Sequence, residues 1–228
     1  MTKKLTLVFL LTITVFCVSI IAISSVKTVH PEEFVVVIDA GHGGIDGGAT
    51  GINTGIKESE INLSVAVKLK DLFESAGISV VMTRTSSLGL YGVLSNGFKR
   101  RDLEKRVEIT NNANADLFIS IHMNEYSDET RKGAQVFFKD DKKSESLARF
   151  VQKELDKIDT DERVGITLSG DYYVLNNSPC PSVICECGFL SNPLDEELLI
   201  SEDYQKKLAH SIYQGACAYF YENATIQY

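Results

Sequence analysis

Residues 35–48 read VVVIDAGHGGIDGG, and this stretch decides the fold. Its first part is a run of mostly β-branched residues, which is typical of a strand buried on both faces. Its second part holds five glycines within eight residues, a density that neither a helix nor a strand interior tolerates. His42 therefore lies just past the carboxyl end of a buried strand, the edge where ligands bind in open α/β sheets.

The size and composition indicate one α/β domain, which we expect to extend over residues 34–228. The chain has 228 residues, of which 44% are hydrophobic and 24% are charged, so it can bury a sizeable core. A net charge of -8 without a basic stripe argues against a nucleic-acid-binding protein. We find no internal repeat, second domain or low-complexity tract.

The amino-terminal segment is expected to lie outside the domain. Two lysines precede an uncharged run over residues 5–26, whose 22 residues would span roughly 33 Å as a helix. Residues 1–26 therefore fit either a cleaved signal peptide or a membrane anchor. The length favours the anchor, and Ala22-Ile23-Ser24 is an imperfect cleavage site. The positive amino end places the rest of the chain outside the cytoplasmic membrane, after a linker over residues 27–33.

Hydrophobic periodicity predicts strands that alternate with helices, and therefore a sheet covered on both faces. Four amphipathic helices are marked by residues 61–73, 99–114, 147–158 and 204–220. Six strands are predicted over residues 35–40, 78–84, 117–122, 133–139, 172–175 and 182–187. The polar, glycine-dotted loop over residues 85–98 is long enough to lie at the mouth of a site.

Four histidines occur, and two of them occupy equivalent places in the predicted fold. His42 and His122 both lie at carboxyl ends of predicted strands, whereas His30 falls in the linker and His210 falls off the apolar face of the last helix. A single histidine usually has a structural role, but two at equivalent strand ends favour a metal site.

Hydrolytic metal sites usually add a carboxylate to two imidazoles and leave one position open for water. Glu58 opens the first helix three and four residues before Ile61 and Asn62, so it lies near the inward face. The alternative is a glutamate that only complements the helix dipole, a role that Glu60 would fill equally well.

A second carboxylate stands inside an apolar strand, where residues 181–189 read PSVICECGF. Period-two alternation sends Cys185 and Cys187 to one face of this strand and Glu186 to the other. Burying a carboxylate is costly unless it is paired, hydrogen-bonded or close to a metal. A structural salt bridge would explain Glu186, but the sequence favours an active-site role.

Other motifs do not fit. Asp46 stands where a dinucleotide-binding loop needs its last glycine, and no phosphate-loop lysine or HExxH helix is present. Cys180, Cys185 and Cys187 lack the paired CxxC spacing of a structural zinc site. We expect these three cysteines and Cys217 to be free thiols.

From about residue 34 to residue 220 the chain resembles the zinc-dependent N-acetylmuramoyl-L-alanine amidases of the type-3 amidase family. The resemblance rests on four ordered blocks: IDAGHGG at 38–44, KE at 57–58, FISIHMN at 118–124 and ECGFLSN at 186–192. It implies zinc bound by His42, Glu58 and His122, with Glu186 as the catalytic carboxylate. It also implies a mixed, twisted sheet, and cleavage of the amide between the lactyl group of N-acetylmuramic acid and L-alanine of the peptidoglycan stem peptide.

A membrane segment that leads into a lone catalytic domain resembles the spore-cortex subgroup of this family. That resemblance implies an extracytoplasmic location, in the intermembrane space of the developing spore, and an accessory protein partner. The segment over residues 89–101 is longer and less acidic than the usual pattern after Thr83-Arg84, so substrate contacts there stay open. Two alternatives are a zinc peptidase acting on the stem peptide and an inactive wall-binding module. The joint presence of His42, Glu58, His122 and Glu186 argues against the inactive module.

Overall fold

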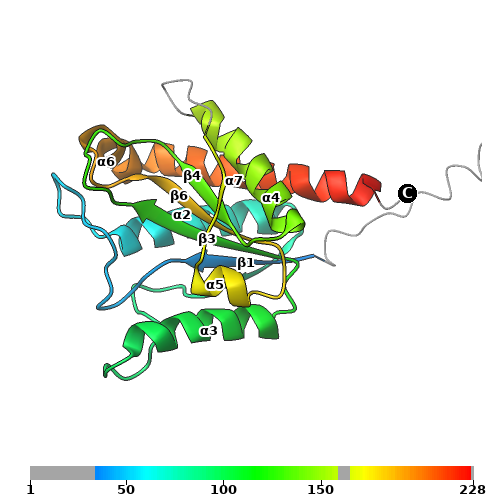
Figure 1. The fold of residues 1–228 in the computed structure, drawn as a ribbon, viewed down its shortest axis with the longest axis horizontal. Helices are drawn as coiled ribbons and strands as arrows, with labels where there is room; N and C mark the ends of the chain where they lie inside the picture. The colour runs from blue at the N-terminus through cyan, green and yellow to red at the C-terminus, as the bar shows by residue number, and fades with distance from the viewer. Residues whose placement is uncertain (1–33, 159–164, 227–228) are drawn as a thin grey trace, which may run out of the picture.

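The computed structural model describes residues 34–158 and 165–226. The predicted signal peptide or anchor and the predicted linker lie outside these residues, so both stay predictions. Within the described ranges, none of the helices combines the length and apolarity of a membrane span. The described chain forms a single α/β domain around one mixed sheet, as the sequence predicted (Figure 1).

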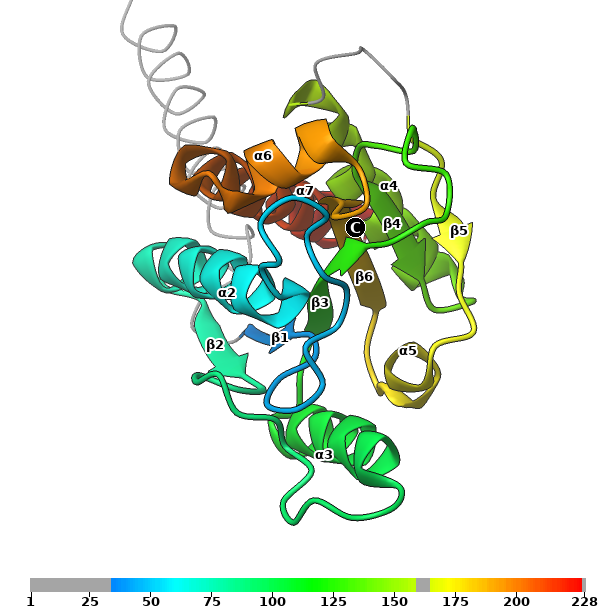
Figure 2. The same cartoon turned by 90° about the vertical axis from the view of Figure 1, so that its left-hand side faces the viewer.

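Within the described residues the sheet has six strands, in the order β2-β1-β3-β6-β4-β5. Their bounds are β1 (Val35–Ala40), β2 (Ser79–Met82), β3 (Leu117–Asn124), β4 (Gln135–Phe138), β5 (Leu168–Ser169) and β6 (Ser182–Phe189). The neighbours β2, β1, β3 and β6 are parallel, and β4 is antiparallel to β6. The carboxyl ends of β1, β3 and β6 therefore meet at one edge, which faces the viewer in Figure 2.

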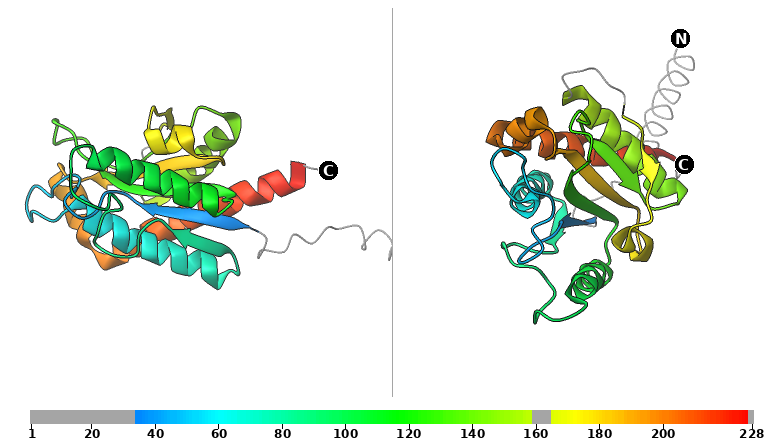
Figure 3. Two further views of the ribbon diagram at one scale, coloured as in Figure 1. Left: turned by 90° about the horizontal axis from the view of Figure 1, so that it is seen from below. Right: turned by 60° about the vertical axis from the view of Figure 1, so that its left-hand side comes forward.

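Helices cover both faces of this sheet (Figure 3). They are α2 (Glu58–Ser75), α3 (Phe98–Asn112), α4 (Lys142–Leu155), the short 3-10 helix η2 (Asp156–Ile158), α5 (Tyr173–Asn177), α6 (Pro193–Ile200) and α7 (Glu202–Ile226). Along β1, Val36 and Ile38 belong to the core cluster under α2, α4 and α7, whereas Val37 belongs to the cluster under α3 and α5. Successive side chains of β1 point to opposite faces of the sheet, and helices cover both faces. Side chains on both faces of this strand are therefore buried, which explains the continuous apolar run at the start of the motif.

One predicted strand is wrong. Residues 172–175 do not join the sheet, because Tyr173–Asn177 form α5, which buries Val174 and Leu175 in the smaller core cluster. Ser178 ends this helix by donating its hydroxyl to the carbonyl of Val174. An apolar run this short does not distinguish a strand from one buried helical turn. The sixth strand is instead β5, a two-residue edge strand parallel to β4.

Two further features concern the carboxyl-terminal part. Helix α6 was not predicted, although Asn192 caps the backbone N–H groups of Leu194 and Asp195, and Pro193 occupies the first turn. The prediction of free thiols is confirmed for the cysteines that the structure describes, which are Cys180, Cys185, Cys187 and Cys217. The first three are buried.

Candidate metal centre and catalytic site

The loop between β1 and α2 carries His42 in an unusual backbone conformation. His42 has a φ of 60°, in the left-handed region that non-glycine residues rarely adopt. The residue before it must be glycine, because a Cβ on Gly41 would lie 2.2 Å from Nε2 of His122. The glycine-rich sequence thus lets the backbone that carries one histidine approach the ring of the other.

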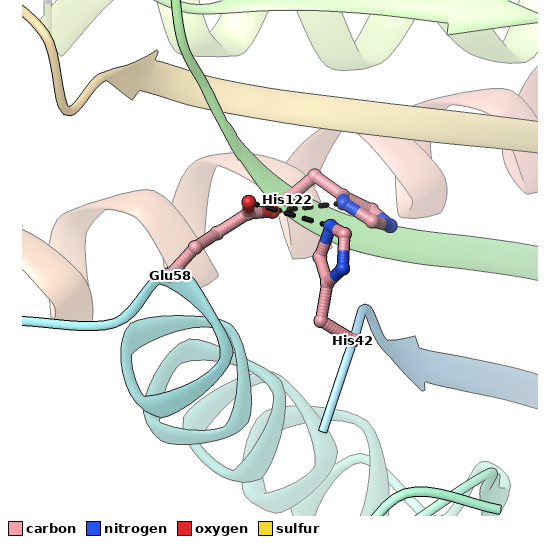
Figure 4. Close-up of side chains that lie close together, drawn as sticks. All are labelled: His42, Glu58 and His122. Atoms are coloured by element: carbon pink, nitrogen blue, oxygen red, sulfur yellow. Dashed lines mark hydrogen bonds and ion pairs between the residues drawn. The ribbon is translucent and has the colours of Figure 1, made fainter. Parts of the chain in front are cut away.

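Three predicted ligands converge from three different elements (Figure 4). His42 follows β1, Glu58 opens α2, and His122 lies near the end of β3. Glu58 Oε2 lies 3.3 Å from His42 Nε2, and Glu58 Oε1 lies 2.9 Å from His122 Nδ1. One potential ligand atom from each residue lies within 4.8 Å of the other two. This spacing lets a single small cation contact all three side chains.

Glu58 is held firmly in an ionised state. Its side chain is only 3% exposed, and its oxygens accept backbone N–H groups from Ala49 at 2.8 Å and Met123 at 3.1 Å. The side-chain amide of Asn62 adds a third donor at 3.1 Å. Burial alone would raise the pKa of Glu58, but the neighbouring imidazole of His122 and these donors outweigh it and lower the pKa to about 2.

The orientation of His42 is fixed by Asp46, which lies 3.0 Å from Nδ1. The hydrogen bond with His42 lowers the pKa of Asp46, so this carboxylate is ionised and can only accept. Nδ1 therefore carries a hydrogen, and Nε2 lies on the side of Glu58. Lys99 Nζ lies 3.2 Å from the second oxygen of Asp46. A carboxylate that orients an imidazole in this way is the usual partner of a metal-binding histidine.

His122 lies beside the Glu58 carboxylate, which shifts its titration. Burial alone would lower its pKa, but the Glu58 carboxylate raises it to about 9. The space between Glu58 and the imidazole thus stabilises positive charge. Two imidazoles and one carboxylate, already facing one another and held by further partners, form a donor set that fits zinc with one position left open.

Glu186 completes the site from the neighbouring strand. It lies beside His122 in the register of β3 and β6, and both residues line a cavity of about 330 Å³ with His42 and Glu58. Burial raises the pKa of Glu186 to about 7. Its Oε2 is buried without a hydrogen-bond partner among the described residues. A carboxyl group poised near neutral pH with a free oxygen can accept and return a proton.

The structure therefore brings together all four residues that the sequence singled out. Glu60 is not part of this cluster and is exposed on the first turn of α2, and His210 is exposed on α7. His30 lies outside the described residues. Sequence reasoning missed the role of Asp46, although its spacing of four residues from His42 within one short loop was an available signal.

The chain is similar to known proteins in both sequence and fold. Residues 36–218 match the model of the family described as N-acetylmuramoyl-L-alanine amidase. Over 193 residues the chain is 37% identical to the germination-specific N-acetylmuramoyl-L-alanine amidase of Bacillus subtilis (strain 168), covering 82% of this chain and 80% of that protein.

Solved structures show the same fold. The CwlD amidase from Clostridioides difficile, solved in complex with the GerS lipoprotein, is 36% identical with a TM-score of 0.80, over 83% of this chain and 100% of that chain. The catalytic domain of CwlV, an N-acetylmuramoyl-L-alanine amidase from Bacillus (Paenibacillus) polymyxa var. colistinus, is 30% identical with a TM-score of 0.70, over 82% of this chain and 98% of that chain. The chain belongs to the N-acetylmuramoyl-L-alanine amidase family.

Proposed function

We propose that this amidase depends on zinc held by His42, Glu58 and His122, and that Glu186 moves the proton in the reaction. The observation that carries the proposal is the convergence of these three side chains within 4.8 Å beside a buried carboxyl oxygen that has no partner. The substrate is the amide between the lactyl group of N-acetylmuramic acid and L-alanine. Family membership supports this choice of bond.

Each residue has a distinct task in the proposed mechanism. Zinc, when bound, would polarise the amide carbonyl and lower the pKa of a water molecule towards 7. Glu186 takes the proton of the attacking water and delivers it to the L-alanine nitrogen as the amide bond breaks. The buried Oε2 of Glu186, which has no hydrogen-bond partner among the described residues, supports this role. Asp46 keeps His42 in the tautomer whose Nε2 is free to bind the metal.

The test combines zinc content with mass analysis of digested peptidoglycan. The purified protein should contain one zinc per chain, and the digest should contain muramic acid with a free lactyl carboxyl group and stem peptides that begin with L-alanine. Cleavage within the stem peptide, with the lactyl amide intact, would instead identify a zinc peptidase. Full turnover after complete removal of metal would contradict the proposed zinc dependence.

We also propose that the substrate is spore-cortex peptidoglycan. The similarity to a germination-specific amidase supports this proposal. Deletion of the gene should leave cortex whose muramic acid keeps its stem peptides, and a copy with Glu186→Gln should not restore the normal composition. Unchanged cortex in the deletion strain would place the activity elsewhere in the cell wall.

The location and the partner complete the proposal. Residues 1–26 would export the domain and anchor it, if uncleaved, outside the cytoplasmic membrane. A lipoprotein is the proposed partner, because the similar CwlD amidase was solved in complex with the GerS lipoprotein. Co-expression with a related lipoprotein from the same organism should give a complex that co-elutes in size-exclusion chromatography. Separate elution at micromolar concentration would argue against this partner.

A further inference from the structure

A buried arginine behind the site has no carboxylate partner. Arg84 follows β2, its side chain is 4% exposed, and none of the ion pairs found among the described residues includes it. Its guanidinium donates instead to backbone carbonyls. Nε reaches Ala40 at 2.8 Å, Nη1 reaches Ser86 at 2.8 Å, and Nη2 reaches Gly41 at 2.9 Å and Ser59 at 2.8 Å.

This arrangement is costly for the folded protein. Burial, together with the nearby Arg106 guanidinium, lowers the pKa of Arg84 to about 10. The carboxylates of Asp39 and Asp102 act in the opposite direction but do not outweigh these effects. Taking a guanidinium out of water without a carboxylate at ion-pair distance disfavours folding compared with an apolar side chain of similar volume. What an apolar side chain cannot supply is a rigid, planar set of donors that fixes several carbonyl oxygens at once.

The carbonyls that Arg84 joins belong to the segments that carry two proposed ligands. Gly41 directly precedes His42, and Ser59 directly follows Glu58. The single nitrogen Nη2 of Arg84 contacts both carbonyls, so it fixes the end of β1 against the first turn of α2.

Asn62 makes a second bridge between the same segments. Its side-chain nitrogen lies 3.1 Å from the carbonyl oxygen of Gly41 and 3.1 Å from Oε1 of Glu58. The residue is fully buried. Two unrelated side chains thus join the backbone at His42 to the helix that carries Glu58.

The bridged segment needs this support. His42 has left-handed backbone geometry, which is strained for a residue other than glycine and persists only where the surroundings enforce it. On its other side, Arg106 donates to the carbonyl of His42 at 2.7 Å. Figure 4 shows His42 and Glu58 reaching the same point from separate segments, so their separation depends on how these segments are held.

We propose that Arg84 and Asn62 are positioning residues that set the distance between His42 and Glu58 before zinc binds. The inference rests on the proposed function, because it takes these two side chains as zinc ligands. Arg84 touches neither the ligands' side chains nor the reacting atoms in this arrangement, and it acts through the backbone. Asn62 acts through the Glu58 carboxylate and the Gly41 carbonyl.

The test compares zinc affinity with folding stability in Arg84→Lys, Arg84→Met and Asn62→Leu. The zinc dissociation constant is measured by competition with a chromophoric chelator, and the unfolding midpoint is measured on the zinc-free protein. Loss of a group that orients ligands typically weakens metal binding by about 10–100-fold, and we expect this for each variant that folds. The absorption spectrum of the cobalt-substituted protein should change as well, since it reports ligand geometry.

Arg101→Lys is the matched control. Arg101 also donates to loop carbonyls, those of Tyr91, Val93 and Asn96, but it holds the loop before α3 rather than a ligand segment. Its replacement should leave the zinc dissociation constant unchanged, even if the unfolding midpoint falls.

Three outcomes decide between the alternatives. Wild-type zinc affinity in folded Arg84→Lys and Asn62→Leu would overturn the inference and leave these residues a purely structural role. If the Arg84 variants do not fold, the zinc affinity of Asn62→Leu decides alone. Zinc bound by His42→Ala as tightly as by the wild type would refute the proposed ligand set itself, which is a separate failure.

Discussion

Glu58 and the half-buried Glu186 line one cavity, yet their surroundings give them opposite properties. Glu58 opens α2, where backbone N–H groups and two imidazoles surround its oxygens, and its pKa falls to about 2. Glu186 lies in the middle of β6, where the ladder uses the backbone donors, and burial raises its pKa to about 7. The place of a carboxylate in the fold thus decides whether it is suited to hold a cation or to carry a proton.

Among the substitutions that test this difference between the two glutamates, Glu186→Gln should have the largest effect. Glutamine keeps the shape of the side chain but removes the basic oxygen, so we expect the rate to fall by roughly 10²–10⁴-fold while zinc stays bound. Turnover on peptidoglycan and zinc content measured on the same preparation check both halves. Near-normal turnover would remove Glu186 from the chemistry.

Glu58→Gln should give the complementary result. Because a neutral amide is a poor ligand, we expect zinc affinity to fall at least as much as for loss of a supporting group, about 10–100-fold or more. His42→Ala and His122→Ala should lose zinc in the same way. If Glu58→Gln kept zinc and Glu186→Gln lost it, the two carboxylates would have exchanged roles.

A smaller effect is expected at Asp46. Asp46→Ala removes the acceptor that orients His42 but leaves all three proposed ligands, so zinc should bind about tenfold more weakly. Lys99→Ala is the control, because Lys99 contacts the other oxygen of Asp46 and is largely exposed. Equal zinc affinity in Asp46→Ala and the wild type would show that the backbone alone orients this ring.

The difference between the two glutamates also explains what the sequence could reveal. Glu186 stood out because a carboxylate in an apolar strand breaks a pattern, and His42 and His122 stood out because both end buried strands. Glu58 looked like an ordinary residue of a helix amino terminus, because its partners come from residues far apart in sequence. The resemblance to the amidase family, rather than periodicity, distinguished it from Glu60.

Other features depended on tertiary contacts that no local pattern records. The bridges made by Arg84 and Asn62 join β1 to α2, and nothing in the sequence next to either residue predicts their acceptors. The order of the strands beyond β6 and the helical state of residues 173–177 depended equally on packing. The strands next to the site were predictable because their composition suits burial on both faces.

A third carboxylate, the buried Asp39, sharpens the comparison through the pH dependence of stability. Burial alone would raise its pKa, but Arg106 and the hydroxyls of Ser120 and Thr83 outweigh burial and lower it. Asp39 therefore resembles Glu58 rather than Glu186, although it binds no proposed metal.

Since the folded state lowers the pKa of Asp39, the unfolded state binds the proton more tightly. The stabilisation is complete above the unfolded value of about 4, and it is lost as the pH falls through the folded value. Zinc-free wild type should accordingly lose unfolding free energy as the pH falls below about 4. The unfolding free energy of Asp39→Asn should be lower than that of the wild type and should change less with pH. Urea unfolding of both proteins at several pH values checks this. If the unfolding free energies of the two proteins changed with pH in the same way, other carboxylates would account for the acid sensitivity. The contacts with Arg106, Ser120 and Thr83 would then not be enough to keep Asp39 ionised.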